Sequence, residues 1–262
     1  MPEPVPIADL TLHPLKFGAV VDWIVQRALG SQGGVVCTPN ADYAVRAHKD
    51  ASFRRAIQSA DIRVPDGMWI VYASRIAGRG IRHTVTGRLL LPAVAARAAQ
   101  AGLPIALYGA GPMVAAEAAA RLQTQNTGLD VAVAITPPFG LTIGSDEDDV
   151  SVERLKASGA RIIFVALGAP KQELWMERRR DDLPGVVLVG VGAAFDIVAG
   201  RFREAPPWMT QIGMEWLFRL WQEPRRLVRR YLIDDPWILV WAIRARLGVD
   251  KSSHPGGIDA RG

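Results

Sequence analysis

Short apolar runs alternate with longer amphipathic segments along most of this chain, and turns rich in glycine or proline follow the runs. The runs predict β-strands at residues 34–38, 61–64, 104–108, 130–135, 161–167 and 186–190. The segments between them predict helices at residues 41–59, 68–77, 89–101, 112–123, 150–158 and 170–182. Such alternation is typical of βαβ units. The sequence therefore predicts an α/β fold with a Rossmann-like parallel sheet and helices on both faces.

The composition changes near residue 200. Residues 1–200 carry almost equal numbers of basic and acidic side chains, whereas residues 201–246 carry nine arginines, five carboxylates and five of the eight tryptophans. We therefore expect an α/β body at residues 1–202, a helical Arg/Trp-rich appendage at 203–248 and a flexible tail at 249–262.

Several classes of protein do not fit the sequence. The single cysteine, Cys37, excludes a disulfide framework and a cysteine-based zinc site. The opening residues lack the basic and apolar segments of a signal peptide. No apolar run approaches the roughly 18–20 residues of a membrane-spanning helix. The cytoplasm is therefore the expected compartment.

Gly-Ala-Pro-Lys-Gln-Glu at residues 168–173 is the most informative of the turns that follow the strands. Its proline suits the first turn of a helix, which places Lys171, Gln172 and Glu173 beside unpaired backbone N–H groups. A lysine and an amide there can bind a phosphate, and a carboxylate can bind hydroxyl groups, a combination that suits a nucleotide-sugar. The alternative is an ordinary helix start with surface side chains.

Similar turns lie at residues 38–40, 65–67, 108–112, 137–140 and 190–196. In open α/β sheets, ligands bind beyond the carboxyl ends of the strands, so these turns predict a binding cleft. Its candidate substrate-binding residues are Asn40, Tyr108, Gly109, Gly140, Gly168, Lys171, Gln172, Glu173, Gly192 and Asp196. A purely structural role remains open for Asp196.

An ordered set of segments carries a family resemblance. The segments lie at residues 38–40, 60–67, 85–87, 107–110, 168–175, 189–196, 203–208, 213–220 and 223–231. Through them the chain resembles the WecG/TagA/CpsF family of bacterial glycosyltransferases. The resemblance implies an inverting, metal-independent enzyme that moves a sugar from a UDP-sugar to a polyprenyl-diphosphate-linked acceptor in cell-surface polysaccharide synthesis. It further implies a sugar of the N-acetylmannosamine, uronic acid or glucose type, no cofactor, and a peripheral location at the inner face of the cell membrane.

Asp66 is the candidate general base. Inverting transfer needs a base near the acceptor hydroxyl, and Asp66 stands on a turn that Pro65 fixes and Gly67 opens to an acceptor. By resemblance, Asp66 aligns with the family's proposed base and Thr38 with a neighbouring active-site threonine. Three structural alternatives stay open: Asp66 caps the next helix, Thr38 closes a strand, and Asn40 caps the helix that begins at residue 41.

The chain departs from the family pattern at one place. Family members commonly carry an arginine two residues before the position of Thr86, and Ser-Asp after the glycine that follows it. Here those positions hold Thr84 and Arg88-Leu89. Arg82, His83 or Arg88 is expected to supply the missing cation, with His83 otherwise a loop histidine. The departure bears on the identity of the donor more than on the class of reaction.

Asp-Glu-Asp-Asp at residues 146–149 matches the Asp-x-Asp string with which many nucleotide-sugar transferases hold a metal ion. The string also precedes a predicted helix, where acidic side chains favour the positive end of the helix dipole. We expect a solvated first helical turn and no metal site.

The appendage contains arginines at spacings that place several on one helix face. Arg219, Arg226 and Arg230 are candidate diphosphate ligands, because a guanidinium matches phosphate oxygens through a planar fork. Residues 237–243 add an apolar run with two tryptophans, which suits an anionic membrane surface. The alternative is a pair of core-packing helices with a solvated basic face. We do not expect nucleic acid as a partner, since that would leave the cleft unused.

Two other classes of function stay open. A nucleotide-binding oxidoreductase is suggested by Gly-Ala-Gly at residues 109–111, although Val114 stands where the fingerprint needs its third glycine. A non-catalytic membrane adaptor would use the appendage alone. The sequence also leaves open whether the chain forms a homo-oligomer.

Overall fold

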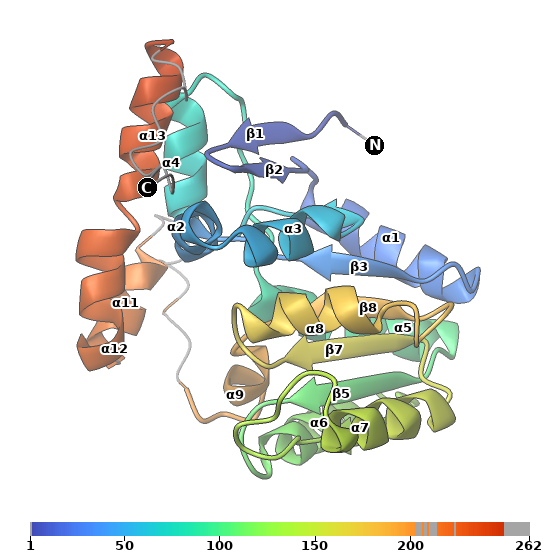
Figure 1. Cartoon of the computed structure of the whole chain (residues 1–262). Helices are drawn as coiled ribbons and strands as arrows, with labels where there is room; N and C mark the ends of the chain where they lie inside the picture. The colour runs from blue at the N-terminus through green and yellow to red at the C-terminus, as the bar shows by residue number, and fades with distance from the viewer. Residues whose placement is uncertain (1, 203–205, 207–208, 210–213, 223, 249–262) are drawn as a thin grey trace, which may run out of the picture.

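The computed structural model describes residues 2–202, 206, 209, 214–222 and 224–248, and its main element is a six-stranded sheet (Figure 1). The strands are β3 (Gly34–Cys37), β4 (Ile62–Arg63), β5 (Ile105–Gly109), β6 (Val131–Ile135), β7 (Ile162–Ala166) and β8 (Val187–Gly190). Their order is β4-β3-β8-β7-β5-β6, and every neighbouring pair is parallel. All six predicted strands are present, so the predicted α/β fold is confirmed.

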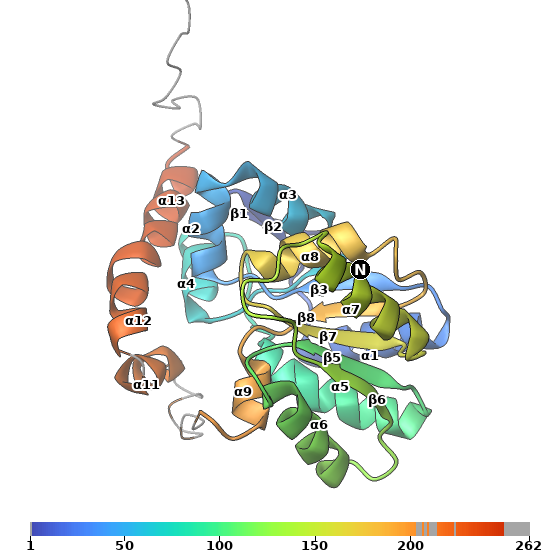
Figure 2. The ribbon, with the colours of Figure 1, turned by 60° about the horizontal axis from the view of Figure 1, so that its bottom comes forward.

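Side chains of each central strand alternate between two helical layers. In β7, Ile162 and Phe164 pack on one side of the sheet, and Ile163 and Val165 pack on the other. The first layer consists of α1 (Phe17–Leu29), α5 (Gly87–Ala101), α6 (Val114–Gln125) and α9 (Ala194–Val198). The second consists of α7 (Asp146–Ala157) and α8 (Lys171–Arg179). Figure 2 shows α7 and α8 on the opposite face of the sheet from α1, α5 and α6. Because helices cover both faces, a binding site is expected at the ends of the strands.

A third apolar cluster lies beyond the β4 end of the sheet. It contains the hairpin of β1 (Val5–Ile7) and β2 (Leu10–Leu12), together with α2 (Ala41–Lys49), α3 (Ala51–Ser59) and α4 (Met68–Ile76). The prediction of a single helix at residues 41–59 is wrong, because the helix is interrupted at Asp50. The Asp50 carboxylate accepts hydrogen bonds from the backbone N–H groups of Ser52 and Phe53, at 2.9 and 3.1 Å, and so starts a second helix.

The C-terminal region is helical, as expected. Its elements are α11 (Glu215–Gln222), α12 (Pro224–Arg229), a π-helical turn η1 (Arg230–Asp234) and α13 (Trp237–Arg246). Helix α13 runs beside α4 (Figure 1), and its Ile238 and Ala242 are buried in the third cluster. The core-packing alternative therefore holds for this side of α13. The tail predicted at residues 249–262 lies outside the described residues.

Within the described ranges, no helix combines the length and the apolar character that a membrane-spanning segment requires.

Candidate active site

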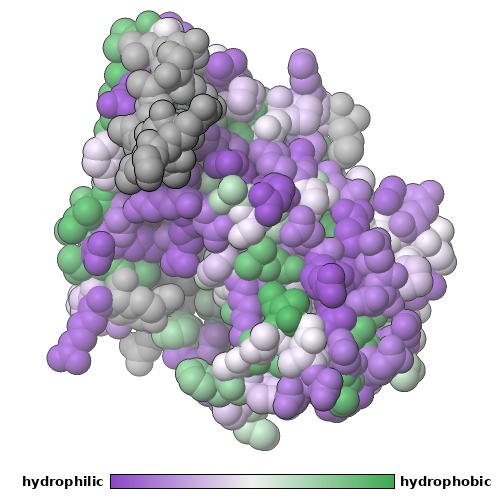
Figure 3. All heavy atoms as spheres, viewed as in Figure 1, coloured by the Kyte–Doolittle hydropathy of each residue, from purple (hydrophilic) through white to green (hydrophobic). Residues whose placement is uncertain are grey.

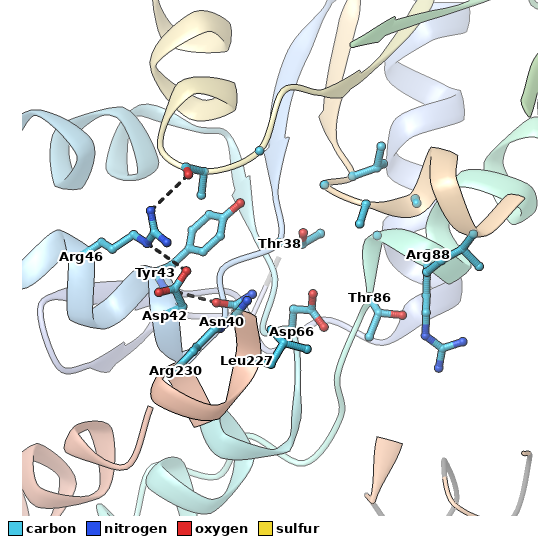
Figure 4. A pocket seen from close by; sticks show the side chains of 18 of the residues that line it. Thr38, Asn40, Asp42, Tyr43, Arg46, Asp66, Thr86, Arg88, Leu227 and Arg230 are labelled. Atoms are coloured by element: carbon cyan, nitrogen blue, oxygen red, sulfur yellow. Dashed lines mark hydrogen bonds and ion pairs between the residues drawn. The ribbon is translucent and has the colours of Figure 1, made fainter. Parts of the chain in front are cut away.

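A cavity of about 260 Å³ opens at the carboxyl edge of the sheet, where the turns after four strands meet (Figure 4). Thr38 follows β3, Asp66 follows β4, Gly168 follows β7, and Gly192 follows β8. Pockets that enclose a drug-sized ligand begin at roughly 300 Å³, so a larger ligand would extend out of this cavity. The cleft predicted from the turns is therefore present at the edge where open α/β sheets bind ligands.

Asp66 lines the cavity from a turn with fixed backbone. Its N–H donates to the carbonyl of Pro39 at 2.8 Å, and the N–H of Val85 donates to the carbonyl of Pro65 at 2.8 Å. Gly67, at a φ of 84°, occupies the N-cap position of α4. Asp66 thus stands one residue before the N-cap position that the alternative gave it. In Figure 4 its carboxylate points into the cavity on the side of Thr38.

Thr38 and Asn40 reach the cavity from the end of β3 and the start of α2. Thr38 is buried, and its hydroxyl donates to the carbonyl of Gly190 at 3.4 Å. Asn40 accepts a hydrogen bond from the backbone N–H of Tyr43 at 3.2 Å and so caps α2. The structural alternative for Asn40 is confirmed, and its position in the cavity wall leaves a binding role compatible with the cap.

The turn at residues 168–173 takes part in the site in a different way from the one predicted. Gly168 lines the cavity, and Lys171 lies half-buried outside it. Gln172 and Glu173 are 0% and 1% exposed, beneath the cavity rather than in its wall. Burial raises the pKa of Glu173 to about 7. The expectation that Gln172 and Glu173 bind the substrate directly is corrected, because α8 packs this side of its first turn into the protein.

Arginine side chains stand on two sides of the cavity (Figure 4). Arg46 is held by the Asp42 carboxylate at 2.9 Å and by the carbonyl of Ala169 at 3.2 Å. Arg230 reaches in from η1, 3.8 Å from Asp235. Burial alone would lower the pKa of Arg230, but the nearby Asp42 and Asp235 carboxylates raise it, so its guanidinium stays charged. The cavity therefore has fixed positive charge beside the Asp66 carboxylate.

The profile of the glycosyl transferase WecG/TagA/CpsF family matches residues 5–252. The chain belongs to this family. It is also 29% identical over 229 residues to the N-acetylglucosaminyldiphosphoundecaprenol N-acetyl-beta-D-mannosaminyltransferase of Bacillus spizizenii, a match that covers 87% of this chain and 86% of the relative. The resemblance read from the sequence is thereby confirmed, and a glycosyltransferase is favoured over an oxidoreductase or an adaptor.

The place where this chain departs from the WecG/TagA/CpsF pattern lies in the cavity wall. Thr86, Gly87 and Arg88 line it, whereas Arg82 and His83 are exposed and lie outside it. Of the three cations considered for the missing arginine, Arg88 is therefore the one that the fold brings to the site. Figure 4 shows it across the cavity from Arg230.

Other candidate residues lie away from the cavity. The phenol of Tyr108 is buried and donates to Asp148 at 3.4 Å, so direct contact with a ligand in this cavity is ruled out for it. Gly109 passes so close to β7 that a Cβ would lie 2.5 Å from the carbonyl oxygen of Ala166. Others outside the cavity wall are Arg82, Gly140 and Asp196. Arg219 lies in α11 and Arg226 lies in α12, but the structure does not describe the side chains of these two residues.

Lining residues that the sequence did not single out include Asp42, Tyr43, Arg46, Leu227 and Tyr231. The first three lie on α2, within two turns of Asn40. Helical spacing would have placed Tyr43 on the side of Asn40, and Arg46 on the side of Tyr43 and Asp42, because residues three and four apart share a helix face. Leu227 lies three residues before the predicted Arg230, so the same spacing points to it, and Tyr231 is the next residue after Arg230.

The acidic string at residues 146–149 begins α7, as expected, with Ser145 as its cap. The expectation of a solvated turn is wrong for Asp148, which is 0% exposed. Its carboxylate accepts hydrogen bonds from Arg179 at 2.6 Å, from Trp175 at 2.7 Å and from the N–H of Gly144 at 2.8 Å. Burial alone would raise the pKa of Asp148, but these bonds hold it below its usual value. In the described part of the chain, no group of three or more His, Cys, Asp or Glu side chains is placed to hold a metal ion.

Proposed function

We propose that this chain is an inverting, metal-independent glycosyltransferase that moves a sugar from a UDP-sugar to a polyprenyl-diphosphate-linked acceptor. The observation that carries the proposal is the Asp66 carboxylate, which faces a cavity beside Thr38 and between Arg88 and Arg230. A base and fixed cations in one cavity are the groups that transfer to a hydroxyl with a diphosphate leaving group needs. The match to a lipid-diphosphate-dependent relative supports this class of acceptor.

In the proposed reaction, the acceptor hydroxyl gives its proton to Asp66 as its oxygen bonds to the anomeric carbon of the donor sugar. The bond between that carbon and the UDP oxygen breaks on the opposite face, and UDP leaves with the electron pair. Arg88 and Arg230 offset the charge that develops on the diphosphate, a task for which arginine's planar fork is suited. Thr38 orients one of the reacting groups through its hydroxyl.

The C-terminal helices are proposed to seat the enzyme on the inner face of the cell membrane. Leu232, Ile233 and Trp237 are 59%, 58% and 50% exposed, and Trp221 is 74% exposed. Figure 3 shows apolar side chains along the edge of the molecule formed by α11–α13. Large groups of exposed apolar side chains are rare on the surfaces of soluble proteins, and tryptophan beside arginine suits a membrane interface. Trp241 differs, because its ring packs on His48 with centroids 4.8 Å apart.

The activity is tested by a screen of UDP-sugars with a lipid-diphosphate-linked saccharide, followed as UDP release. The name of the relative makes N-acetylmannosamine the first donor sugar to try, before its uronic acid and glucose. Asp66→Asn should lower turnover by roughly 10²–10⁴ while the fold is kept, the range for loss of a general base. Asp130→Asn, at an exposed position before β6, is the matched control. Near-normal turnover of folded Asp66→Asn would show that Asp66 is not the base.

A further inference from the structure

Two walls of the cavity are joined beneath it by buried side chains of α8. The hydroxyl of Tyr43, on α2, donates to Glu173 Oε1 at 2.7 Å. Gln172 Nε2 donates to the same carboxylate oxygen at 2.8 Å, and Gln172 Oε1 accepts the N–H of Gly192 at 3.0 Å. Three hydrogen bonds therefore run without interruption from the α2 wall to the turn after β8.

We propose that Glu173 is a positioning residue for the transfer reaction, which fixes Tyr43 and the turn at Gly192 through hydrogen bonds without touching the substrate. The proposal rests on the proposed function. At 1% exposure, the Glu173 carboxylate lies below the cavity, whereas Tyr43 and Gly192 both line it. The carboxylate thus acts on residues that a ligand in the cavity would meet, and not on the ligand.

The turn that Gln172 holds also sets the position of two other parts of the site. Thr38 donates to the carbonyl of Gly190, at the start of this turn. At Gly87, a Cβ would lie 2.7 Å from the carbonyl oxygen of Val191, so the turn abuts the first residue of α5. A shift of the turn would therefore move the Thr38 hydroxyl and the wall that carries Arg88 together.

Close packing makes this arrangement specific. A Cβ at Gly190 would lie 2.5 Å from Gln172 Nε2, so β8 must end in glycine for the Gln172 side chain to pass. The orientation of the amide is fixed as well, since only its nitrogen can donate to Glu173 and only its oxygen can accept from Gly192. Glu173 and the N–H of Gly192 therefore determine together which way the Gln172 amide faces.

The task of Glu173 requires an acceptor oxygen and not a negative charge. Oε1 accepts both hydrogen bonds, while Oε2 is buried without a hydrogen-bond partner in the described part of the chain. The charged and titratable groups around it are Tyr43, Cys37 and Arg46. Burial raises the pKa of Glu173 to about 7, so the carboxyl already carries a proton part of the time near neutral pH. A neutral amide oxygen can take its place.

The test compares Glu173→Ala with Glu173→Gln, and kcat and donor KM are measured well below the unfolding temperature. Glu173→Ala should lower kcat by about 10–100-fold, because a small displacement of reacting groups has an effect of that size. Glu173→Gln should stay close to the wild type. Glu177→Ala, one turn further along α8, is the control and should leave both parameters unchanged. Loss of activity in Glu173→Gln equal to that in Glu173→Ala would overturn the proposal, as would a normal kcat and KM in Glu173→Ala.

Two measurements cover the remaining outcomes. If Glu173→Ala does not fold, Tyr43→Phe removes only the hydroxyl at the other end of the bond, and an unchanged kcat there would also overturn the proposal. If the wild type transfers no sugar, the proposed function fails, and the positioning role of Glu173 is then tested on the backbone N–H of Gly192. Its hydrogen exchange should be faster in Glu173→Ala than in the wild type and unchanged in Glu177→Ala; equal rates in all three would refute the positioning role.

Discussion

Replacing Ile238 by alanine should destabilise the whole chain and not only its C-terminal helices. Ile238 is 0% exposed, in the apolar cluster that also contains Ile70 of α4 and the β1–β2 hairpin. Truncation of a buried isoleucine to alanine costs about 2–5 kcal/mol, part of it from the cavity left behind. For a chain of this length, each kcal/mol lowers the unfolding midpoint by about 2–4 °C. We therefore expect a shift of roughly 10 °C, from the middle of both ranges.

The assay is thermal unfolding followed by far-UV circular dichroism and by tryptophan fluorescence. Ile243→Ala is the matched control, because Ile243 lies on the same helix but is 47% exposed, and it should change stability by no more than about 0.5 kcal/mol. A single transition that shifts in both signals is the expected result. If the main transition stays in place while a separate, earlier one appears, the C-terminal region is an independent unit and the reasoning from the shared cluster fails. A chain that ends at residue 202 would then fold with its stability unchanged.

Three further predictions concern pH, charge and metal. Between about pH 5 and 8, the free energy of unfolding of Glu173→Gln should rise by about 3 kcal/mol relative to that of the wild type. The cause is the raised pKa of Glu173: the folded wild type holds a proton on this carboxyl up to about pH 7 and must then ionise it while it is buried, which lowers the stability of the wild type. Urea unfolding at several pH values measures this difference, and parallel curves for the two proteins would contradict it. Arg179→Met should cost about 3–5 kcal/mol in urea unfolding, because the fully buried Asp148 loses its ion partner, whereas Arg178→Met on the exposed side of α8 should be almost neutral. Transfer should survive EDTA, because Asp148 is bonded to Arg179 and Trp175; loss of activity that Mg²⁺ or Mn²⁺ restores would reverse this reading.

The sheet could be predicted because buried parallel strands are short apolar runs on both faces, as in β7, where all five residues are buried. The hairpin gave no comparable signal, since strands of three residues are too short for a period to show. The break between α2 and α3 depends on one side chain, Asp50, which bonds to the backbone two and three residues ahead. Such local capping competes with an apolar pattern that runs through both helices, and the pattern alone suggests one helix.

The site could be predicted to the level of turns but not of side-chain direction. Strand order puts Thr38, Asp66 and the turn at Gly192 on one edge, whichever helices cover the sheet. Which side of α8 faces inward depends on its packing against neighbouring elements, and these bury Gln172 and Glu173. Tertiary packing of this kind has no local sequence signal.

Helix α4 connects the candidate base with the C-terminal arginine. It begins directly after the Asp66–Gly67 turn, and along its length it packs against α13. Near its start, the ring of Trp69 lies 6.3 Å from that of Trp216, which in turn lies 6.0 Å from that of Tyr231, the neighbour of Arg230. The position of Arg230 relative to Asp66 therefore depends on α4 and its aromatic contacts, in addition to the contact of η1 with α2. For this reason a change in the α4–α13 packing, such as Ile238→Ala, should lower transfer to a soluble acceptor even at temperatures where the variant is fully folded, while Ile243→Ala should leave transfer to that acceptor unchanged.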